Sequence, residues 1–375
     1  MTEYNGFRRE EPDMKRRECL TLFSTGCVVA SSGCLEAAGS RSPLLHGFYP
    51  GRKAASPATF RPFEKWLGRV PTVLTLYVNA NLSEDSIRDY LDTQLTPVWQ
   101  TGHVPVITWL PYLGTPEQTP ADIERRIHTG QYDDIIDRWI SALTEWVLDG
   151  DGEDRRLYFR PLPEMNGNWL PWSAVGTETT PADYRSAWQY LYNRFREAGL
   201  TATHVQWMWN PNFREVGGVA TEEYYPGDEF VDWVGIDGYN FGSTQDWSEW
   251  MSPDEVFAPM LSRVRTLTQK PVAFPEFGST SFKEGTPRPA AKSQWITDVY
   301  EFMRREDVKM ACWFNVDKET DWAVFDGTRG TDTYETDDRQ YNVYDSYKRA
   351  VTRDVLSNGE RPERLLTDDQ FAGNF

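Results

Sequence analysis

Apolar residues recur along the chain in short continuous runs, separated by longer segments with helical periodicity. Strands buried in a parallel sheet read as near-continuous hydrophobic runs rather than as alternating ones. Eight runs have this character, and each ends near Gly, Pro, Asn or a charged residue. We predict strands at 44–49, 72–78, 104–110, 157–162, 205–209, 231–237, 272–274 and 309–315.

The intervening segments place apolar residues three and four positions apart, which is typical of amphipathic helices. In 132–148, for example, Ile136, Trp139, Leu143 and Val147 fall on one face. Strands that alternate with helices predict one (β/α)8 TIM barrel, in the α/β class. We predict helices at 83–99, 120–127, 132–148, 181–199, 254–267, 289–305 and 347–355.

The pattern divides the 375 residues into four parts. Residues 1–35 combine an upstream extension with an export signal, and 36–43 form a linker. The barrel domain spans 44–356, and we expect 357–375 to be a peripheral tail. No linker composition interrupts the barrel segment, which disfavours a two-domain division.

The predicted signal begins with basic residues, continues with an apolar stretch and closes with small residues. Its paired arginines, Arg16 and Arg17, resemble a twin-arginine export signal, and Ser31-Ser32-Gly33-Cys34 resembles a lipobox. We therefore expect an extracellular or cell-surface protein that touches a membrane only through a lipid on Cys34. The alternative is an uncleaved N-terminal anchor.

The net charge of −18 and the pI near 4.8 exclude nucleic acid and anionic membrane surfaces as expected partners, since both would repel the chain. Acidic residues are spread along the whole sequence. They suggest an organism living at high salt, where self-repulsion is screened. The alternative is an ordinary acidic secreted protein.

Metal and cofactor chemistry find little support in the sequence. No two of the four histidines stand at metal-ligand spacing, and no Cys/His cluster occurs. Neither a phosphate-binding glycine loop nor a serine-hydrolase elbow is present. We predict no metal and no cofactor. Cys312, in an apolar run, is expected to be a small core residue.

Two glutamates follow buried strands in matching contexts. Glu164 ends the Tyr158–Pro163 run and is followed by Trp169 and Trp172, and Glu276 ends the Val272–Pro275 run. In a parallel barrel the C-terminal strand ends meet on one face. Two carboxyl groups about 5–5.5 Å apart would suit double-displacement cleavage of a glycoside. The alternative is a pair of solvated glutamates beside tryptophans that pack in the core.

Other polar and aromatic residues lie at the same strand ends, where substrate would bind. Sixteen tryptophans suit stacking on sugar rings, although a merely aromatic core would also use them. The candidates at strand ends are Tyr49, Trp109, Arg160, Trp209, Asn210, Tyr239 and Trp313. Asp237 is either a site residue or a hydrogen-bond partner behind it.

Several of these motifs together resemble glycoside hydrolase family 26, which is best known for endo-β-mannanases and also contains β-glucanases and β-1,3-xylanases. The run from Arg160 to Trp169 resembles the family's acid/base motif, and Pro275–Gly278 resembles its nucleophile strand. Trp233–Asn240 and Trp313–Trp322 resemble the ends of its sixth and eighth strands. The resemblance covers most of residues 44–322, in the right order.

The resemblance implies roles for individual residues. Glu164 would be the general acid/base and Glu276 the nucleophile. Tyr239 would hold the nucleophile, and Arg160 would lie beneath both carboxylates. Substrate-binding residues would be Arg160, Trp109, Trp169, Trp172, Asn210, Tyr239, Trp313 and Trp322.

One residue departs from the family pattern: Pro163 stands where the family usually has His before the acid/base. Mannan preference is therefore less secure than glycosidase activity. We predict a monomeric retaining endo-β-1,4-mannanase, with a β-1,3/1,4-glucanase or β-1,3-xylanase as alternatives. A non-catalytic sugar-binding lipoprotein is the alternative of another class, and a hydrolase of another two-glutamate barrel family is the third.

Overall fold

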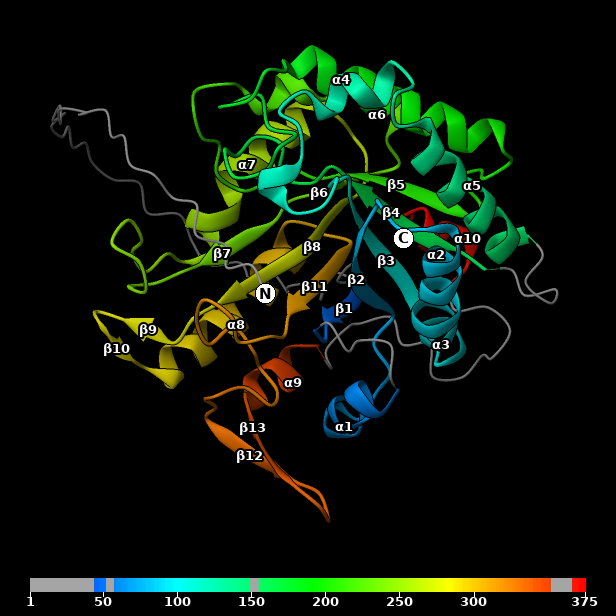
Figure 1. Ribbon diagram of the computed structural model, residues 1–375. Coiled ribbons are helices and arrows are strands. Elements are labelled where there is room, and N and C mark those ends of the chain that lie inside the picture. The colour runs from blue at the N-terminus through cyan, green and yellow to red at the C-terminus, as the bar shows by residue number, and fades with distance from the viewer. Residues whose placement is uncertain (1–43, 52–56, 149–154, 352–365) are drawn as a thin grey trace, which may run out of the picture. The chain divides into compact units, whose positions relative to one another are not determined.

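The computed structural model describes residues 44–51, 57–148, 155–351 and 366–375 (Figure 1). The predicted export signal and Cys34 lie outside the described residues. Within the described part of the chain, no helix is both long and apolar enough to pass through a lipid bilayer.

Eight parallel strands close into a barrel, as predicted. The order around the barrel is β1, β2, β3, β4, β5, β6, β8, β11, and β11 pairs with both β8 and β1. A short extra strand, β7, pairs with the C-terminal end of β8. The barrel strands and β7 are β1 (Leu45–Tyr49), β2 (Val73–Asn79), β3 (Val104–Leu110), β4 (Leu157–Pro161), β5 (Val205–Trp209), β6 (Trp233–Gly235), β7 (Gly238–Asn240), β8 (Val272–Ser279) and β11 (Met310–Phe314).

α-Helices connect most of the strands, as expected for a (β/α)8 barrel (Figure 1), and two 3-10 turns lie between β5 and β6. The predicted helix at 83–99 begins after a Ser83 cap but contains one π-helical turn, Leu91–Leu95. The α-helices are α1 (Pro57–Leu67), α2 (Glu84–Tyr90), α3 (Thr96–Gln100), α4 (Ile123–His128), α5 (Asp133–Leu148), α6 (Pro181–Glu197), α7 (Pro253–Leu267), α8 (Pro289–Arg305), α9 (Asp345–Val351) and α10 (Asp368–Phe371). Short 3-10 turns occur at Pro116–Gln118, Thr221–Tyr224 and Asp228–Phe230.

Two antiparallel hairpins project from the connections. The first, β9 (Phe282–Lys283) with β10 (Thr286–Pro287), follows β8, and the second, β12 (Asp332–Glu335) with β13 (Gln340–Val343), follows β11. The C-terminal strand ends, from which both hairpins extend, form the face on which barrel enzymes carry their chemistry.

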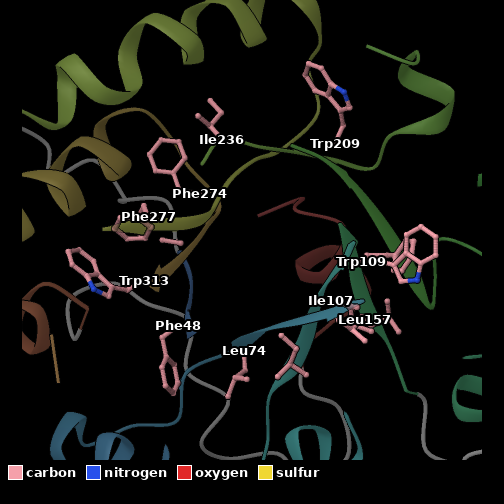
Figure 2. Packing of buried hydrophobic residues seen from close by; sticks show 14 of the residues in the cluster. Phe48, Leu74, Ile107, Trp109, Leu157, Trp209, Ile236, Phe274, Phe277 and Trp313 are labelled. Carbon is pink, nitrogen blue, oxygen red and sulfur yellow. The ribbon is translucent and has the colours of Figure 1, made fainter. Parts of the chain in front are cut away.

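The core is unusually rich in indole rings. Ten tryptophans have side chains less than 2% exposed, including Trp109, Trp209 and Trp313, which Figure 2 shows packed between the barrel and its helices. Phe274 stacks on Phe257 of α7 with ring centroids 4.1 Å apart. Most of the tryptophan content therefore stabilises the fold.

The C-terminal segment closes the opposite end of the barrel. Phe371 is 1% exposed, and its carbonyl accepts hydrogen bonds from Tyr158 Oη and Trp233 Nε1, each at 3.1 Å. Arg156 Nη2 pairs with Asp368 Oδ1 at 2.8 Å. The prediction of a peripheral tail is therefore wrong for 366–375, because α10 packs against the N-terminal ends of β4 and β6.

Candidate active site

Glu164 lies on a strained turn directly after β4. Both Leu162 and Glu164 have positive φ, at 49° and 55°, which side chains other than glycine rarely adopt. Surrounding hydrogen bonds hold this conformation. Glu164 N donates to Asn210 O at 2.7 Å, Trp172 Nε1 to Pro163 O at 2.7 Å, and Tyr184 Oη to Leu162 O at 3.1 Å. The turn fixes where the Glu164 carboxyl points.

Two neutral donors contact the Glu164 carboxyl. Trp169 Nε1 donates to Oε2 at 2.9 Å, and Asn212 Nδ2 donates to Oε1 at 2.6 Å. Part of the side chain reaches solvent, but burial of the carboxyl raises its pKa, and the charge of Glu276 raises it further. Gly167 permits this arrangement, because a Cβ there would lie 2.6 Å from the Trp169 ring. Glu164 is thus disposed to carry a proton.

Glu276, on β8, has charged and phenolic donors instead. Arg160 Nη2 donates to Oε2 at 2.8 Å, the Tyr77 hydroxyl donates to the same oxygen, and Tyr239 Oη donates to Oε1 at 2.8 Å. Burial and the negative charge of Glu276 raise the pKa of both phenols well above the ordinary value. Both remain protonated and can only donate to this carboxylate.

Arg160 is buried, and its guanidinium pairs with two carboxylates. Nη1 lies 2.8 and 3.0 Å from the two oxygens of the buried Asp237, and Nε donates to Thr108 Oγ1 at 2.9 Å. Its interaction with Glu164 is only electrostatic. Arg160 therefore lies under Glu276 and Asp237 rather than under both glutamates, and Asp237 is the partner that orients it.

The remaining predicted substrate-binding residues divide into two groups. Trp169 is partly exposed beside Glu164, and Trp322 packs on Tyr239 with ring centroids 4.8 Å apart, although it is only 1% exposed. Asn210 is buried, and its Oδ1 lies 3.5 Å from Arg160 Nη1. These side chains surround or support the two glutamates.

Three predicted sugar-stacking tryptophans lie elsewhere, and for them the prediction is wrong. Trp109 packs on Phe159 and is 1% exposed, and Trp313 packs on Phe277 and is fully buried. Trp172 is also fully buried and holds the Glu164 turn through its indole N–H. None of these rings presents a face to solvent, because each fills space between the strands and the surrounding helices.

Two contacts of the site were missed from the sequence. Tyr77 lies in the middle of a predicted strand and was interpreted only as part of an apolar run. Thr75, Tyr77 and Asn79 alternate along β2, and this period of two was the available signal for a polar inner face. Asn212 follows β5 by three residues; its backbone N–H donates to Asn166 Oδ1 of the loop after β4, and its Oδ1 accepts from Arg214 N within its own loop. No group of His, Cys, Asp and Glu that could hold a metal ion occurs among the described residues.

Comparison with known proteins identifies relatives that are named as glycan-cleaving enzymes. A family model described as "Glycosyl hydrolase family 26" matches residues 91–259. Endoglucanase H of Acetivibrio thermocellus is 30% identical over 318 residues, which cover 83% of this chain and 32% of that protein. Mannan endo-1,4-beta-mannosidase of Bacillus subtilis is 27% identical over 170 residues, covering 42% of this chain and 45% of that one. The chain thus spans less than half the length of these curated relatives.

Solved structures show the same fold. The catalytic domain of the GH26 endo-beta-1,4-mannanase of Bacillus sp. JAMB-750 has a TM-score of 0.63 at 20% identity, covering 87% of this chain and 90% of that one. An endo-beta-1,4-mannanase of Cellulomonas fimi has a TM-score of 0.60 at 19% identity, covering 86% and 74%. At these identities the structures support the barrel alone. The similarity to glycosyl hydrolase family 26 comes from the family model over residues 91–259 and from the sequence relatives.

Proposed function

We propose that this protein is a retaining glycoside hydrolase that cleaves a β-linked polysaccharide by double displacement. The observation that carries the proposal is the contrast between two neighbouring carboxyl groups. Glu164 has a raised pKa and only neutral donors, whereas Glu276 receives one guanidinium and two phenol donors. Pairs of carboxyls in such opposed surroundings divide into an acid and a nucleophile.

The geometry supports the following sequence of steps. Glu164, protonated, gives its proton to the glycosidic oxygen while Glu276 attacks the anomeric carbon, so the glycosidic bond breaks as an ester to Glu276 forms. Glu164, now a carboxylate, then takes a proton from water as the water attacks the anomeric carbon. The ester breaks, and Glu276 returns to its carboxylate form. Arg160, Tyr77 and Tyr239 donate hydrogen bonds that orient the Glu276 carboxylate.

For the substrate, we propose β-1,4-mannan, with endo action, because several of the relatives are mannan endo-1,4-beta-mannosidases. A β-1,3/1,4-glucan is the second candidate. Two observations favour it: Endoglucanase H matches 83% of the chain, and Pro163 cannot donate a hydrogen bond to a sugar. A β-1,3-xylan remains the third.

Reducing-sugar release from mannan, galactomannan, mixed-linkage β-glucan and β-1,3-xylan tests the proposal. We expect release from one of these substrates, abolished in both Glu164→Ala and Glu276→Ala. Circular dichroism of the variants controls for folding. Binding of a polysaccharide without any release by the wild-type protein would favour the sugar-binding lipoprotein instead.

The predicted location and salt response also remain proposals. We propose export with a lipid on Cys34, which mass spectrometry of the membrane-bound protein and a Cys34→Ala control would test. A chain of net charge −18 is also expected to gain stability as salt screens its self-repulsion. A melting temperature that does not rise into molar NaCl would contradict adaptation to high salt.

A further inference from the structure

Asn166 is a buried amide two residues after Glu164, in the loop between β4 and α6. It is 1% exposed. A buried amide is costly unless both its oxygen and its nitrogen find hydrogen-bond partners. The partners of Asn166 therefore indicate what this side chain does in the folded protein.

Both ends of the Asn166 amide bind one neighbouring loop, the connection between β5 and β6. Oδ1 accepts from Asn212 N at 2.8 Å, and Nδ2 donates to Asn212 O at 2.9 Å and to Thr221 Oγ1 at 3.0 Å. The backbone carbonyl of Asn166 accepts from Val216 N at 2.9 Å. Asn166 thus ties the loop after β4 to the loop after β5 at three residues.

The Asn166 side chain binds the next loop beyond the point where regular pairing of the two strands ends. The register of β4 with β5 covers Leu157–Phe159. The chain then leaves the sheet on the turn with positive φ at Leu162 and Glu164. Asn166 binds both the N–H and the C=O of Asn212, as a neighbouring strand would. A carboxamide side chain therefore holds this backbone in place of a paired strand.

Asn212, which Asn166 holds, is one of the two donors to the acid. Its Nδ2 donates to Glu164 Oε1 at 2.6 Å, and its Oδ1 accepts from Arg214 N at 3.0 Å, which fixes the end of the amide that faces the carboxyl. On its other side, Asn212 pairs with Asp237 in an isolated parallel bridge. The backbone of Asn212 is thus fixed from two sides, so its donor is in position before the reaction begins.

Thr221 holds the Asn166 amide from the side away from Asn212. Thr221 is 2% exposed, and its hydroxyl accepts from Asn166 and donates to Glu215 Oε2 at 3.0 Å. The same carboxylate oxygen accepts from Thr221 N at 2.9 Å and from Arg263 Nη2 of α7 at 2.7 Å. The Thr221 hydroxyl proton is therefore committed to Glu215, which leaves the hydroxyl oxygen as an acceptor for Asn166.

We propose that Asn166 is a positioning residue of the reaction, which acts through Asn212 on the Glu164 carboxyl. Its amide holds the Asn212 backbone so that Nδ2 meets Oε1 of the acid, and Thr221 holds the amide in turn. The inference rests on the proposed function for the acid role of Glu164, but the hydrogen bonds do not depend on that role. Loss of Asn166 should change the ionisation of Glu164 and the acid-dependent step, and leave KM for polysaccharide unchanged.

The ionisation of Glu164 can be measured without turnover, by carbon-13 NMR of protein labelled at the side-chain carboxyl carbons of glutamate. The signal of Glu164 is the one that is absent from Glu164→Gln. Burial and the charge of Glu276 raise the pKa of Glu164. Hydrogen bonds from Trp169 and Asn212 and the charge of Arg160 lower it. A variant that displaces Asn212 should therefore raise this pKa.

The variants test whether Asn166 acts through Asn212. We expect Asn212→Ala to raise the pKa of Glu164 by about one unit or less, and Asn166→Ala to raise it by part of that amount. The double variant should match Asn212→Ala alone, because the two residues act in one chain of contacts. Thr221→Val should give a smaller rise, and Thr221→Ser, which keeps the hydroxyl, should give none.

Asn315→Ala is the matched control for the loss of a loop-anchoring amide. Asn315 Oδ1 accepts from Val324 N at 2.8 Å and Phe325 N at 3.0 Å, and its Nδ2 donates to Phe325 O at 3.1 Å. These bonds hold the loop after β11. Asn315→Ala should lower the melting temperature, as Asn166→Ala does, but leave the pKa of Glu164 unchanged.

The outcomes separate this inference from the proposed function. An unchanged pKa of Glu164 in Asn166→Ala would overturn the positioning role, and so would an equal rise in Asn315→Ala or additive rises in the double variant. If the pKa depends on Asn166 but the wild-type protein releases no sugar from any polysaccharide, the positioning role stands and the hydrolase activity fails. If melting curves show that Asn166→Ala has lost its fold, the comparison of Thr221→Val with Thr221→Ser decides in its place.

Discussion

Glu164 directly follows β4 and Glu276 lies within β8 of the same barrel, yet the protein surrounds these two identical side chains differently. Glu276 lies within β8, at an irregularity in its pairing with β11, and accepts from Arg160, Tyr77 and Tyr239. Glu164 lies on a turn with positive φ and accepts only from an indole and an amide. In the proposed mechanism the neighbours, and not the residue type, assign the acid role to Glu164 and the nucleophile role to Glu276.

The distribution of charge explains the contrast. Three carboxyls, Glu164, Asp237 and Glu276, surround one guanidinium, Arg160, which makes its hydrogen bonds to Asp237 and Glu276. Burial and the neighbouring carboxyl groups raise the pKa of both Glu164 and Asp237, but only Asp237 is paired with Arg160. The turn at Glu164 has a strained, positive-φ backbone that only strong tertiary constraints maintain, so the position of this carboxyl is fixed by the surrounding structure.

The largest effect is expected from removing the nucleophile. Glu276→Ala should lower kcat by about 10⁴-fold or more on every substrate, because no covalent intermediate can form. Steady-state hydrolysis of the polysaccharide and of an activated dinitrophenyl glycoside would measure it. Residual activity near the wild-type value on either substrate would contradict the role.

Removing the carboxyl of Glu164 should have a different kinetic effect from removing that of Glu276. Glu164→Ala should lower kcat/KM on polysaccharide by roughly 10²–10⁴-fold. The first step should recover with a dinitrophenyl leaving group, which departs without a proton. A burst of dinitrophenol in stopped-flow measurements would show this recovery. An equal loss of activity on both substrates would contradict the assignment of Glu164 as the acid.

A smaller loss is expected when one donor to the nucleophile is removed. Tyr77→Phe deletes the hydroxyl that contacts Glu276 and should lower kcat by roughly tenfold to a hundredfold with little change in KM. Tyr132→Phe is a matched control. Its hydroxyl is buried and has no hydrogen-bond partner among the described residues. If both variants lose the same activity, the Tyr77 contact has no specific role.

The smallest expected effect is a shift in the pH dependence of kcat/KM when Trp169 is replaced by Phe. Trp169 donates to the Glu164 carboxylate and so favours its ionised form, which lowers the pKa that burial and Glu276 raise. Trp169→Phe should raise this pKa further, because the charged form loses a donor. Since the acid must be protonated to act, the alkaline limb of kcat/KM should move to higher pH by about one unit or less. A shift to lower pH would have the wrong sign.

The barrel could be predicted because its strands are buried on both faces, so each strand is a continuous apolar run that ends at a recognisable boundary. The runs 104–110 and 205–209 match β3 and β5 residue for residue. The C-terminal segment could not be placed, because Phe371 packs against Tyr158 and Trp233, contacts across the chain that no local pattern encodes. The π-helical turn at Leu91–Leu95 could not be predicted either, because it leaves the spacing of the apolar residues nearly unchanged.

Glu164 follows β4 as predicted, whereas Glu276 lies within β8, which continues to Ser279 beyond the predicted strand 272–274. The surroundings of the aromatic residues could not be predicted. Trp169 and Trp172 lie three positions apart in the same loop, but one contacts Glu164 and the other is buried beneath Pro163. A tryptophan in the core and one that faces a sugar have the same sequence signature, since both are apolar with one donor. Tyr77 was missed for the same reason, because a tyrosine inside a strand is ordinarily a packing residue.

The most direct test of the account is to trap the covalent intermediate. The probe is a mechanism-based glycoside with fluorine on the carbon next to the anomeric centre, built from the sugar that the polysaccharide panel identifies. After digestion, peptide mass spectrometry locates the attached sugar. The account predicts one label, on Glu276, and none in Glu276→Ala. A label on Glu164 or Asp237, or release of product with inverted anomeric configuration, would contradict it.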